Sequence, residues 1–506
     1  MFQKKIKFIL LFSLFTFHFS LFASTLHLSI SANPSRLNPL IATDGTSHEI
    51  SSWIFSSLVK YDKDAKVTPH LAKSYRFIDD TTLEFELKKG ILWSDGKEFT
   101  SQDIIFTYQT IISPKIFTPY SSDFRYVKSV EMSGKYKILV KYKEPYFKAL
   151  EIWMMDILPH HILKDDKDLM TSKFNKHPIG IGSYTIKGFT PSNDINLFAN
   201  KSYFKHKPLI DKITYHFIPD PSTEFLTLKT KKLDIGSLTP MQYERQIDDD
   251  FKKHFKILEK MSQGYTYLGF NLRDKKFKNP KIREALSLAI DRQELVDILF
   301  LGHGQICNGP FMPKTFAYPT DLKTQNPNLQ KAKKLLKEAG YGKNNPFAFE
   351  LVTNSNNSTR VYTAQVIQHQ LKKIGVKMKI IVMEWQGFLN TVVMPKKFET
   401  VLLGWGLGLM PDAYSIWHSE SDKKGGFNFV GYKNQKVDEL IKKGEKTIDK
   451  KKLGEIYREI FKLIRADNPY LFLYIPNSIT VVNKKIKNVS NSIIGIRHNT
   501  IDWIKE

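Results

Sequence analysis

The sequence has very little cysteine: Cys307 is the only one among 506 residues. An internal disulfide is therefore excluded, as is a metal site built from several cysteines. The chain also lacks the H-E-x-x-H zinc motif, the G-x-S-x-G turn of serine hydrolases and the G-x-x-x-x-G-K-[ST] phosphate loop. These absences remove the best-marked enzyme classes, although a catalytic triad assembled from distant residues stays open. No cofactor is expected, because the glycines of "GWGLGL" (404–409) do not fit the dinucleotide-binding spacing.

Acidic residues are scarce relative to basic ones. Lys and Arg total 76 against 51 Asp and Glu, a formal net charge of +25 at pH 7. An excess of this size is typical of proteins that bind nucleic acid or anionic surfaces. Here, however, the lysines are scattered, commonly in pairs such as Lys88 and Lys89, with no long basic tail. This distribution favours a solvated, lysine-rich surface over a nucleic-acid site.

The first 23 residues have the pattern of an export signal. Three lysines lie within the first seven residues, an apolar run spans residues 8–22, and Ala23 offers a small residue for cleavage. A membrane anchor is the alternative, but the run is short for a bilayer span and His18 interrupts it. No cysteine near Ala23 could carry a lipid. We therefore expect a periplasmic protein of a Gram-negative type that is not a lipoprotein and does not span the membrane after cleavage.

Strand and helix signals alternate along the rest of the chain. In the first half, "TLHLSI" (25–30) and "TTLEFELKKG" (81–90) alternate as strands do, and "FTSQDIIFTYQTII" (99–112) predicts a helix with Thr100 as its N-cap and Asp103 completing a capping box. Asn279 is expected to cap a helix opened by Pro280.

In the second half the helix and strand signals follow one another in turn. Asp291 and Glu294 predict a second capping box. The predicted helices that follow are "LQKAKKLLKEAG" (329–340), "STRVYTAQVIQHQLKKIG" (358–375) and "WQGFLNTVV" (385–393), and the predicted strands are "VKMKIIVM" (376–383) and "FETVLLGW" (398–405). This alternation indicates an α/β unit.

One carboxylate, Asp412, lies in an apolar, glycine-rich stretch, "GWGLGLMPDAYSIWHS" (404–419). The stretch follows a predicted strand, and ligands of open α/β sheets bind beyond the carboxyl ends of strands. It is therefore a candidate site, although Asp412 would equally suit a turn or helix cap. By contrast, the adjacent His160 and His161 are expected to point apart and to be structural.

Several segments, taken in order, resemble the extracellular solute-binding proteins of the dipeptide and oligopeptide class, which deliver ligands to ABC importers. They are "LNPL" (37–40), "TPHLAKSYRFIDDTTLEFELKKGILWSDGKEFTSQDIIFTY" (68–108), "PIGIGSYTIKGF" (178–189), "NKSYFKHKPLIDKITYHFIPDPSTEFLTLKTKKLDIG" (200–236), "YLGFNLRDKKFKNPKIREALSLAIDR" (267–292), "QLKKIGVKMKI" (370–380) and the glycine-rich stretch with "FNFVGYKNQKVDELI" after it. The resemblance covers nearly all of the chain past the signal.

The resemblance implies an α/β fold of two lobes that close on a ligand cleft, with an extra third domain. The expected division is a signal peptide at 1–23, lobe I at 24–52, 169–263 and 475–506, the extra domain at 53–168, and lobe II at 264–474. Such a protein binds by lobe closure and performs no catalysis. Its expected partners are a short peptide and the permease subunits of the importer, and a monomer is expected.

The resemblance also implies roles for individual residues. Asp412 would bind the amino terminus of the peptide, and Arg360 would bind its carboxylate, where a helix N-terminus also favours an anion. Arg360 would equally suit the solvent-facing side of its helix. Trp405, Tyr120 and Tyr265 are candidate cleft residues, each with core packing as the alternative.

The sequence departs from the family pattern at two places. The usual G-T-G-P-Y is here Gly180-Ile181-Gly182-Ser183-Tyr184, and the usual D-P-D is Met410-Pro411-Asp412, which leaves one acid where the family has two. A nickel chelate or another small solute is therefore an alternative ligand, for which His418 would be the loop's metal ligand. A basic secreted protein that binds nucleic acid is a remote alternative.

Overall fold

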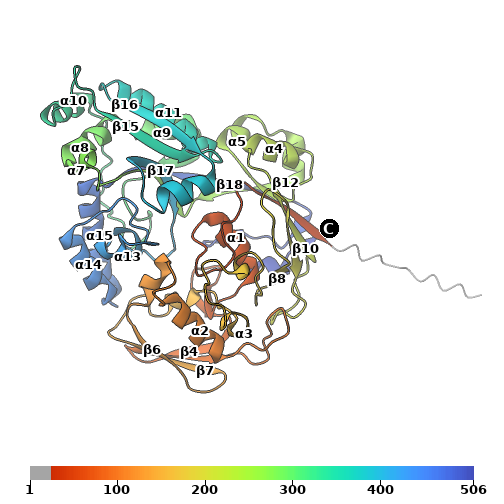
Figure 1. The fold of residues 1–506 in the computed structure, drawn as a ribbon. Coiled ribbons are helices and arrows are strands. Elements are labelled where there is room, and N and C mark those ends of the chain that lie inside the picture. Colours follow the sequence, from red (N-terminus) through yellow and green to blue (C-terminus); the bar gives the residue numbers. More distant parts are fainter. Residues whose placement is uncertain (1–23) are drawn as a thin grey trace, which may run out of the picture.

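A computed structural model describes residues 24–506, so the predicted signal segment at 1–23 lies outside the described residues. Within the described part, no helix combines the length and the apolar character needed to cross a membrane. The elements form three groups, one around the N-terminal strand, one at the bottom of Figure 1 and one across the top and left.

The N-terminal strand builds a small mixed sheet with strands from the middle of the chain. Its order is β1-β10-β9-β8, and β1 and β10 are parallel. The strands are β1 (Thr25–Ile30), β10 (Lys212–Phe217), β9 (Ile195–Ala199) and β8 (Tyr184–Ile186), and α1 (Gly45–Ile54) contacts β8. The predicted strand at 25–30 is confirmed, with Leu26, Leu28 and Ile30 buried on one face.

The second group, at the bottom of Figure 1, is an antiparallel sheet of order β4-β5-β7-β6. Its elements are β2 (Val59–Tyr61), β3 (Val67–Pro69), β4 (Ala72–Asp79), β5 (Thr82–Leu87), α2 (Ser101–Ile111), η1 (Pro119–Phe124), β6 (Val127–Met132), β7 (Lys137–Tyr142), η2 (Glu151–Met154), α3 (His160–Leu163) and η3 (Lys173–Asn175). The predicted capping box of Thr100 and Asp103 at α2 is confirmed. This group and the N-terminal sheet share one continuous apolar core.

The third group is an eight-stranded sheet with helices on both faces. Its main path is β11-β18-β13-β17-β15-β16, and β12 and β14 also pair with β18. The strands are β11 (Ile235–Leu238), β12 (Phe255–Met261), β13 (Gly264–Phe270), β14 (Gly304–Ile306), β15 (Ala348–Asn354), β16 (Lys377–Met383), β17 (Thr400–Gly406) and β18 (Tyr470–Asn483). All seven residues of β13 are buried, as expected for a central strand covered on both sides.

Two helical layers account for that burial. One apolar core lies between the sheet and α8–α11, and the other lies between the sheet and α13–α15. The remaining elements are α4 (Pro221–Lys229), α5 (Pro240–Arg245), α6 (Asp249–His254), α7 (Lys275–Lys278), α8 (Pro280–Ala289), α9 (Arg292–Phe300), α10 (Leu329–Glu338), α11 (Ser358–Lys372), α12 (Trp385–Phe388), η4 (Leu389–Val393), α13 (Tyr414–Trp417), η5 (Ser419–Ser421), α14 (Gln435–Glu445), α15 (Lys450–Asp467), β19 (Ile486–Lys487), η6 (Ile496–Asp502) and β20 (Ile504–Lys505). The predicted α/β alternation is confirmed.

Two predicted details differ from the structure. The segment 385–393 is only briefly α-helical, because η4 continues it as a π-turn. Asp291 does cap α9, but its box is incomplete, since Glu294 accepts a hydrogen bond from the Gln370 side chain at 2.7 Å. The Gln370 side chain has therefore replaced the backbone N–H of Asp291 as the partner of Glu294.

The 14-residue strand β18 connects the third group to the rest of the chain. Its first part, from Tyr470 to Tyr474, pairs with β13, and its last part, from Asn477 to Asn483, pairs with β12. The boundary expected at residues 474 and 475 therefore falls inside one continuous strand. His303 braces this crossing: its two ring nitrogens contact Glu244 of α5 and Glu259 of β12, each at 2.8 Å.

This brace predicts a pH dependence of stability. Burial lowers the pKa of His303, but its bonds to Glu259 and Glu244 outweigh burial and raise the pKa above 6.5. A raised pKa in the folded state stabilises the protein fully below the unfolded value and no longer once the pH has risen through the folded value. We expect His303→Gln to lower the melting temperature more at about pH 5.5 than at about pH 9.

The measurement is a thermal melt of both proteins at each pH. His206→Gln is the matched control, because His206 contacts one acid, Asp502, in an exposed pair. Equal losses at the two pH values for His303→Gln would contradict a protonated brace.

Candidate functional site

The glycine-rich stretch leaves the end of β17 and carries Asp412 into contact with the second group. One carboxylate oxygen of Asp412 accepts a hydrogen bond from the backbone N–H of Tyr414 at 2.9 Å. The other oxygen accepts from the Lys148 ammonium at 2.8 Å. Asp412 thus serves as a turn residue with one oxygen and as an ion-pair partner with the other.

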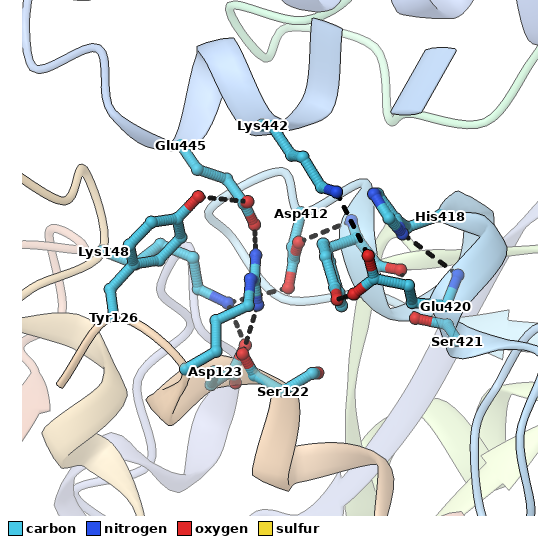
Figure 2. Close-up of polar contacts among 12 residues, drawn as sticks. Ser122, Asp123, Tyr126, Lys148, Asp412, His418, Glu420, Ser421, Lys442 and Glu445 are labelled. Atoms are coloured by element: carbon cyan, nitrogen blue, oxygen red, sulfur yellow. Dashed lines mark hydrogen bonds and ion pairs between the residues drawn. The ribbon is translucent and has the colours of Figure 1, made fainter. Parts of the chain in front are cut away.

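Lys148 is shared between two carboxylates. Its ammonium also contacts Asp123 of η1, at 2.9 Å (Figure 2). The side chains of Lys148, Asp412 and Asp123 are 11%, 18% and 27% exposed. Ion pairs this deep are screened far less than surface pairs, so their geometry matters energetically.

Burial and charge act in opposite directions on these three groups. Burial favours the neutral form of Asp412, but Lys148, with help from Arg125, holds the pKa of that carboxyl below its usual value. Burial raises the pKa of Asp123, and Lys148 offsets this only in part. The pKa of Lys148 is well above normal, since the two carboxylates outweigh its own burial. The surroundings therefore favour the charged forms of Lys148 and Asp412, whereas the pKa of Asp123 is displaced toward its neutral form.

A second ion pair lies beside the first. Arg125 pairs with Glu445 at the end of α14. The Tyr126 hydroxyl donates to the same carboxylate at 3.3 Å (Figure 2). The Arg125 guanidinium lies 3.4 Å from the centre of the Tyr414 ring. The backbone N–H of Phe147 donates to the Glu445 carbonyl at 3.0 Å. These contacts join the second group of elements to the helices of the third.

Arg360 lies elsewhere on the third group, in the first turn of α11. Its guanidinium donates to the Asn354 side chain at 2.8 Å, and its Nε is buried without a hydrogen-bond partner. No acid pairs with it among residues 24–506. Burial lowers the pKa of Arg360, with only the tyrosines Tyr474 and Tyr267 acting against it. A buried guanidinium without a carboxylate is suited to receive one from a ligand.

The helix N-terminus contributes less to this site than the sequence suggests. The backbone N–H of Arg360 is already bonded to the Asn357 side chain at 3.0 Å, so the cap satisfies that donor. A glycine makes room for the guanidinium instead. A Cβ at Gly404 would lie 2.9 Å from Arg360 Nη2, which is closer than side chains normally approach. One glycine of the loop motif therefore accommodates Arg360.

Trp405 lies within an aromatic stack. Its ring is parallel to that of Phe429, with centroids 5.4 Å apart, and to that of Tyr267 at 6.2 Å. Its indole N–H donates to the Tyr470 hydroxyl at 3.3 Å. Phe427 meets Trp405 edge-on and also contacts Tyr120 at 6.1 Å. Trp405 is only partly buried, so packing does not use its whole surface.

The other two aromatic candidates differ in exposure. Tyr120 is partly buried, and its hydroxyl donates to the Ala42 carbonyl at 2.8 Å, so the hydroxyl already has a partner. Tyr265 is 2% exposed and packs against Tyr267 and Phe472. Its position is that of a core residue.

The histidine singled out for a metal is also in the interior. His418 is 1% exposed, its ring stacks on Tyr414 at 4.3 Å, and its Nδ1 accepts from the Glu420 N–H at 3.1 Å. Among the described residues, no group of three or more His, Cys, Asp and Glu side chains is arranged to hold a metal. His160 and His161 contact different partners, as expected, but His161 does have an acid nearby, Asp95 at 2.7 Å.

The structure brings some candidates together and adds others. Trp405 contacts Tyr267, which packs against Tyr265, and Phe427 connects Trp405 to Tyr120. Asp412, by contrast, belongs to a cluster of charged residues that the sequence analysis missed. The missed residues are Asp123, Arg125, Lys148 and Glu445. A signal for Lys148 does exist in the sequence, since it lies in the apolar stretch "PYFKALEIWMM" (145–155) much as Asp412 lies in its loop. No local pattern marks the others.

Comparison with known proteins identifies the class. Residues 66–427 match the model described as "Bacterial extracellular solute-binding proteins, family 5 Middle". The chain belongs to this family, and the two-lobed fold expected from the sequence is confirmed.

Individual relatives agree with this assignment. The oligopeptide-binding protein AppA of Bacillus subtilis is 34% identical over 464 residues, 88% of this chain and 85% of the relative. Its structure in complex with a nonapeptide superposes with a TM-score of 0.90 at 32% identity, covering 95% of this chain and 99% of that one. NikZ of Campylobacter jejuni in complex with Ni(L-His) has a TM-score of 0.85 at 26% identity, covering 96% and 100%.

Opposite stability effects are predicted for the two buried cations. Lys148→Met would leave two buried carboxylates without their shared partner and cost about 3 kcal/mol. Arg360→Met would remove a buried cation that has no acid partner, and should leave the ligand-free protein as stable or more stable by about 1 kcal/mol.

Melting temperatures of protein stripped of ligand by unfolding and refolding would measure both effects. A large loss for Arg360→Met would show that Arg360 supports the fold and is not held ready for a ligand.

Proposed function

We propose that the protein is the substrate-binding component of an ABC importer and that it captures short peptides. A peptide carries an ammonium group at one end and a carboxylate at the other. The chain offers a partly buried acidic cluster at Asp412 and, separately at Arg360, a partly buried guanidinium that has a buried Nε and no acid partner within residues 24–506. The unpaired state of Arg360 is the observation that carries this proposal, because an anion from outside would complete its contacts.

The aromatic residues suit the same ligand. The partly buried face of Trp405 offers a flat surface to a peptide plane or side chain, and Tyr120 approaches the same stack from the second group of elements. Tyr265 would support this surface from beneath. The similarity to a protein solved with a nonapeptide adds weight to a peptide over other solutes.

The binding event we propose is closure of two lobes with no bond made or broken. Lobe I would comprise 24–52, 169–263 and 475–506, lobe II would comprise 264–474, and 53–168 would be the extra domain. Closure would bring the acidic cluster and Arg360 onto one ligand. The partner is then the importer's permease, and the protein acts as a periplasmic monomer that is neither an enzyme nor a nucleic-acid binder.

The peptide ends provide the direct test. Asp412→Asn should weaken binding of peptides with a free amino terminus by about 2 to 5 kcal/mol, the scale for removing one partner of a buried charge pair. Arg360→Met should produce a loss at the upper end of this range for peptides with a free carboxylate and none for C-terminally amidated peptides. Calorimetry with free and blocked peptides measures both.

Equal affinity of the unmodified protein for blocked and free peptides would contradict both roles. Native mass spectrometry of gently eluted protein would separate the ligand classes by mass, since a bound nickel chelate rather than a peptide would overturn the peptide proposal. A steep loss of affinity with salt would instead point to an anionic surface partner.

A further inference from the structure

The ion cluster around Lys148 is not electrically balanced. Arg125 and Glu445 form one complete pair, but the Lys148 ammonium is shared by Asp123 and Asp412. Three carboxylates therefore face two cations, and one negative charge lacks a counter-charge within the network. Figure 2 shows Asp123 and Asp412 approaching Lys148 from different segments of the chain.

Burial makes this imbalance costly. None of the three side chains in the Lys148 contact is more than 27% exposed, so water compensates the extra charge only weakly. The pKa of Asp123 reflects this, because burial and the repulsion of Asp412 raise it against the attraction of Lys148. Asp123 is thus the carboxylate whose negative charge is least offset by nearby positive charge.

An unsatisfied hydroxyl lies beside the same cluster. Tyr457 of α15 is 0% exposed, and its hydroxyl has no hydrogen-bond partner among residues 24–506. Burial, and then the charge of Asp412, raise the pKa of this hydroxyl, while Lys148 and the backbone of Ala413 act against them. Buried polar atoms rarely lack a partner, so the surroundings of the cluster are not fully satisfied by the chain's own groups.

We propose that Asp123 and Asp412 together form the binding site for the ammonium group of the ligand, with Lys148 as a resident cation that limits the site to one added positive charge. This inference rests on the proposed function. It assigns to Asp123 the second carboxylate that the sequence Met410-Pro411-Asp412 lacks, and this carboxylate comes from the other side of the interface. The ammonium group of the ligand would then hold η1 against the loop after β17.

The experiment compares free and N-acetylated peptides on matched variants. The probes are a pool of tri- to nonapeptides from a protease digest and the same pool after acetylation. Native mass spectrometry gives the ratio of free to acetylated peptide bound by the unmodified protein, Asp123→Asn, Asp412→Asn and Lys148→Met. The ratio cancels general effects of a substitution on folding and on the rest of the peptide site, because these affect both pools equally.

We expect Asp123→Asn and Asp412→Asn each to lower this ratio by about thirtyfold or more, equivalent to about 2 kcal/mol. Lys148→Met should raise it, because the two carboxylates then lack their resident cation. Asp165→Asn, an exposed aspartate in the same part of the chain, is the matched control and should leave the ratio unchanged. Melting temperatures identify any variant that has lost its fold, and Asp123→Asn is nearly isosteric.

Three results would overturn the inference in distinguishable ways. A ratio that falls for Asp412→Asn but not for Asp123→Asn would leave the peptide function in place and remove Asp123 from the site. A ratio that does not rise for Lys148→Met would reject the resident-cation role. If the unmodified protein bound neither pool, the proposed function would fail, and this inference with it.

Discussion

The contact of one buried ammonium with two carboxylates sets the arrangement of the site. Lys148 and Asp412 are 264 residues apart in the chain, and Lys148 follows Phe147, whose backbone is bonded to α14. A lysine in such apolar surroundings is tolerated only with acids beside it, and an aspartate only with a base. Each group therefore fixes the other, and the loop after β17 is held at the interface through this pair.

The rest of the fold allows such an interface to open and close. The second group of elements shares its core with the N-terminal sheet, whereas the third group has cores of its own. Within the third group, strand β18 joins the part of the sheet that contains β12 to the part that contains β13. In proteins that close by a hinge, a few residues absorb the rotation while the packed groups move as rigid bodies. Polar contacts across the interface suit that motion better than an apolar core would, because water satisfies them again after opening.

Much of the fold was predictable because its signals are local. Thr100 and Asp103 cap α2 through neighbouring backbone atoms, and the alternation in residues 25–30 directly records which face is buried. The incomplete capping box at Asp291 could not be predicted from local sequence, because Glu294 accepts a hydrogen bond from Gln370, which is distant in the chain. Hydrogen bonds between residues close in sequence can be predicted from the sequence, but those with side chains that only the fold brings near cannot.

The candidate site was predictable in part, for the same reason. Asp412 stands out because a single charge in an apolar stretch needs a partner, but nothing local identifies that partner. Asp123 and Glu445 lie in ordinary polar surroundings in the sequence, and only the fold makes them neighbours of Lys148 and Arg125. Gly404 is a similar case: its role of giving space to Arg360 depends on strand β17 passing over α11.

The two ends of the proposed ligand meet unequal environments, and this asymmetry follows from the charges. The acidic cluster already contains a cation, so an arriving ammonium group gains only the attraction that Lys148 has left over. Arg360 has no carboxylate to give up, and its buried Nε lacks a partner, so an arriving carboxylate gains a full charge-assisted interaction. Low polarity strengthens both interactions equally. The difference is that the carboxylates already pair with Lys148, whereas Arg360 has no acid partner in the described part of the chain. The carboxylate end should therefore supply most of the affinity, and the ammonium end should act mainly in selection.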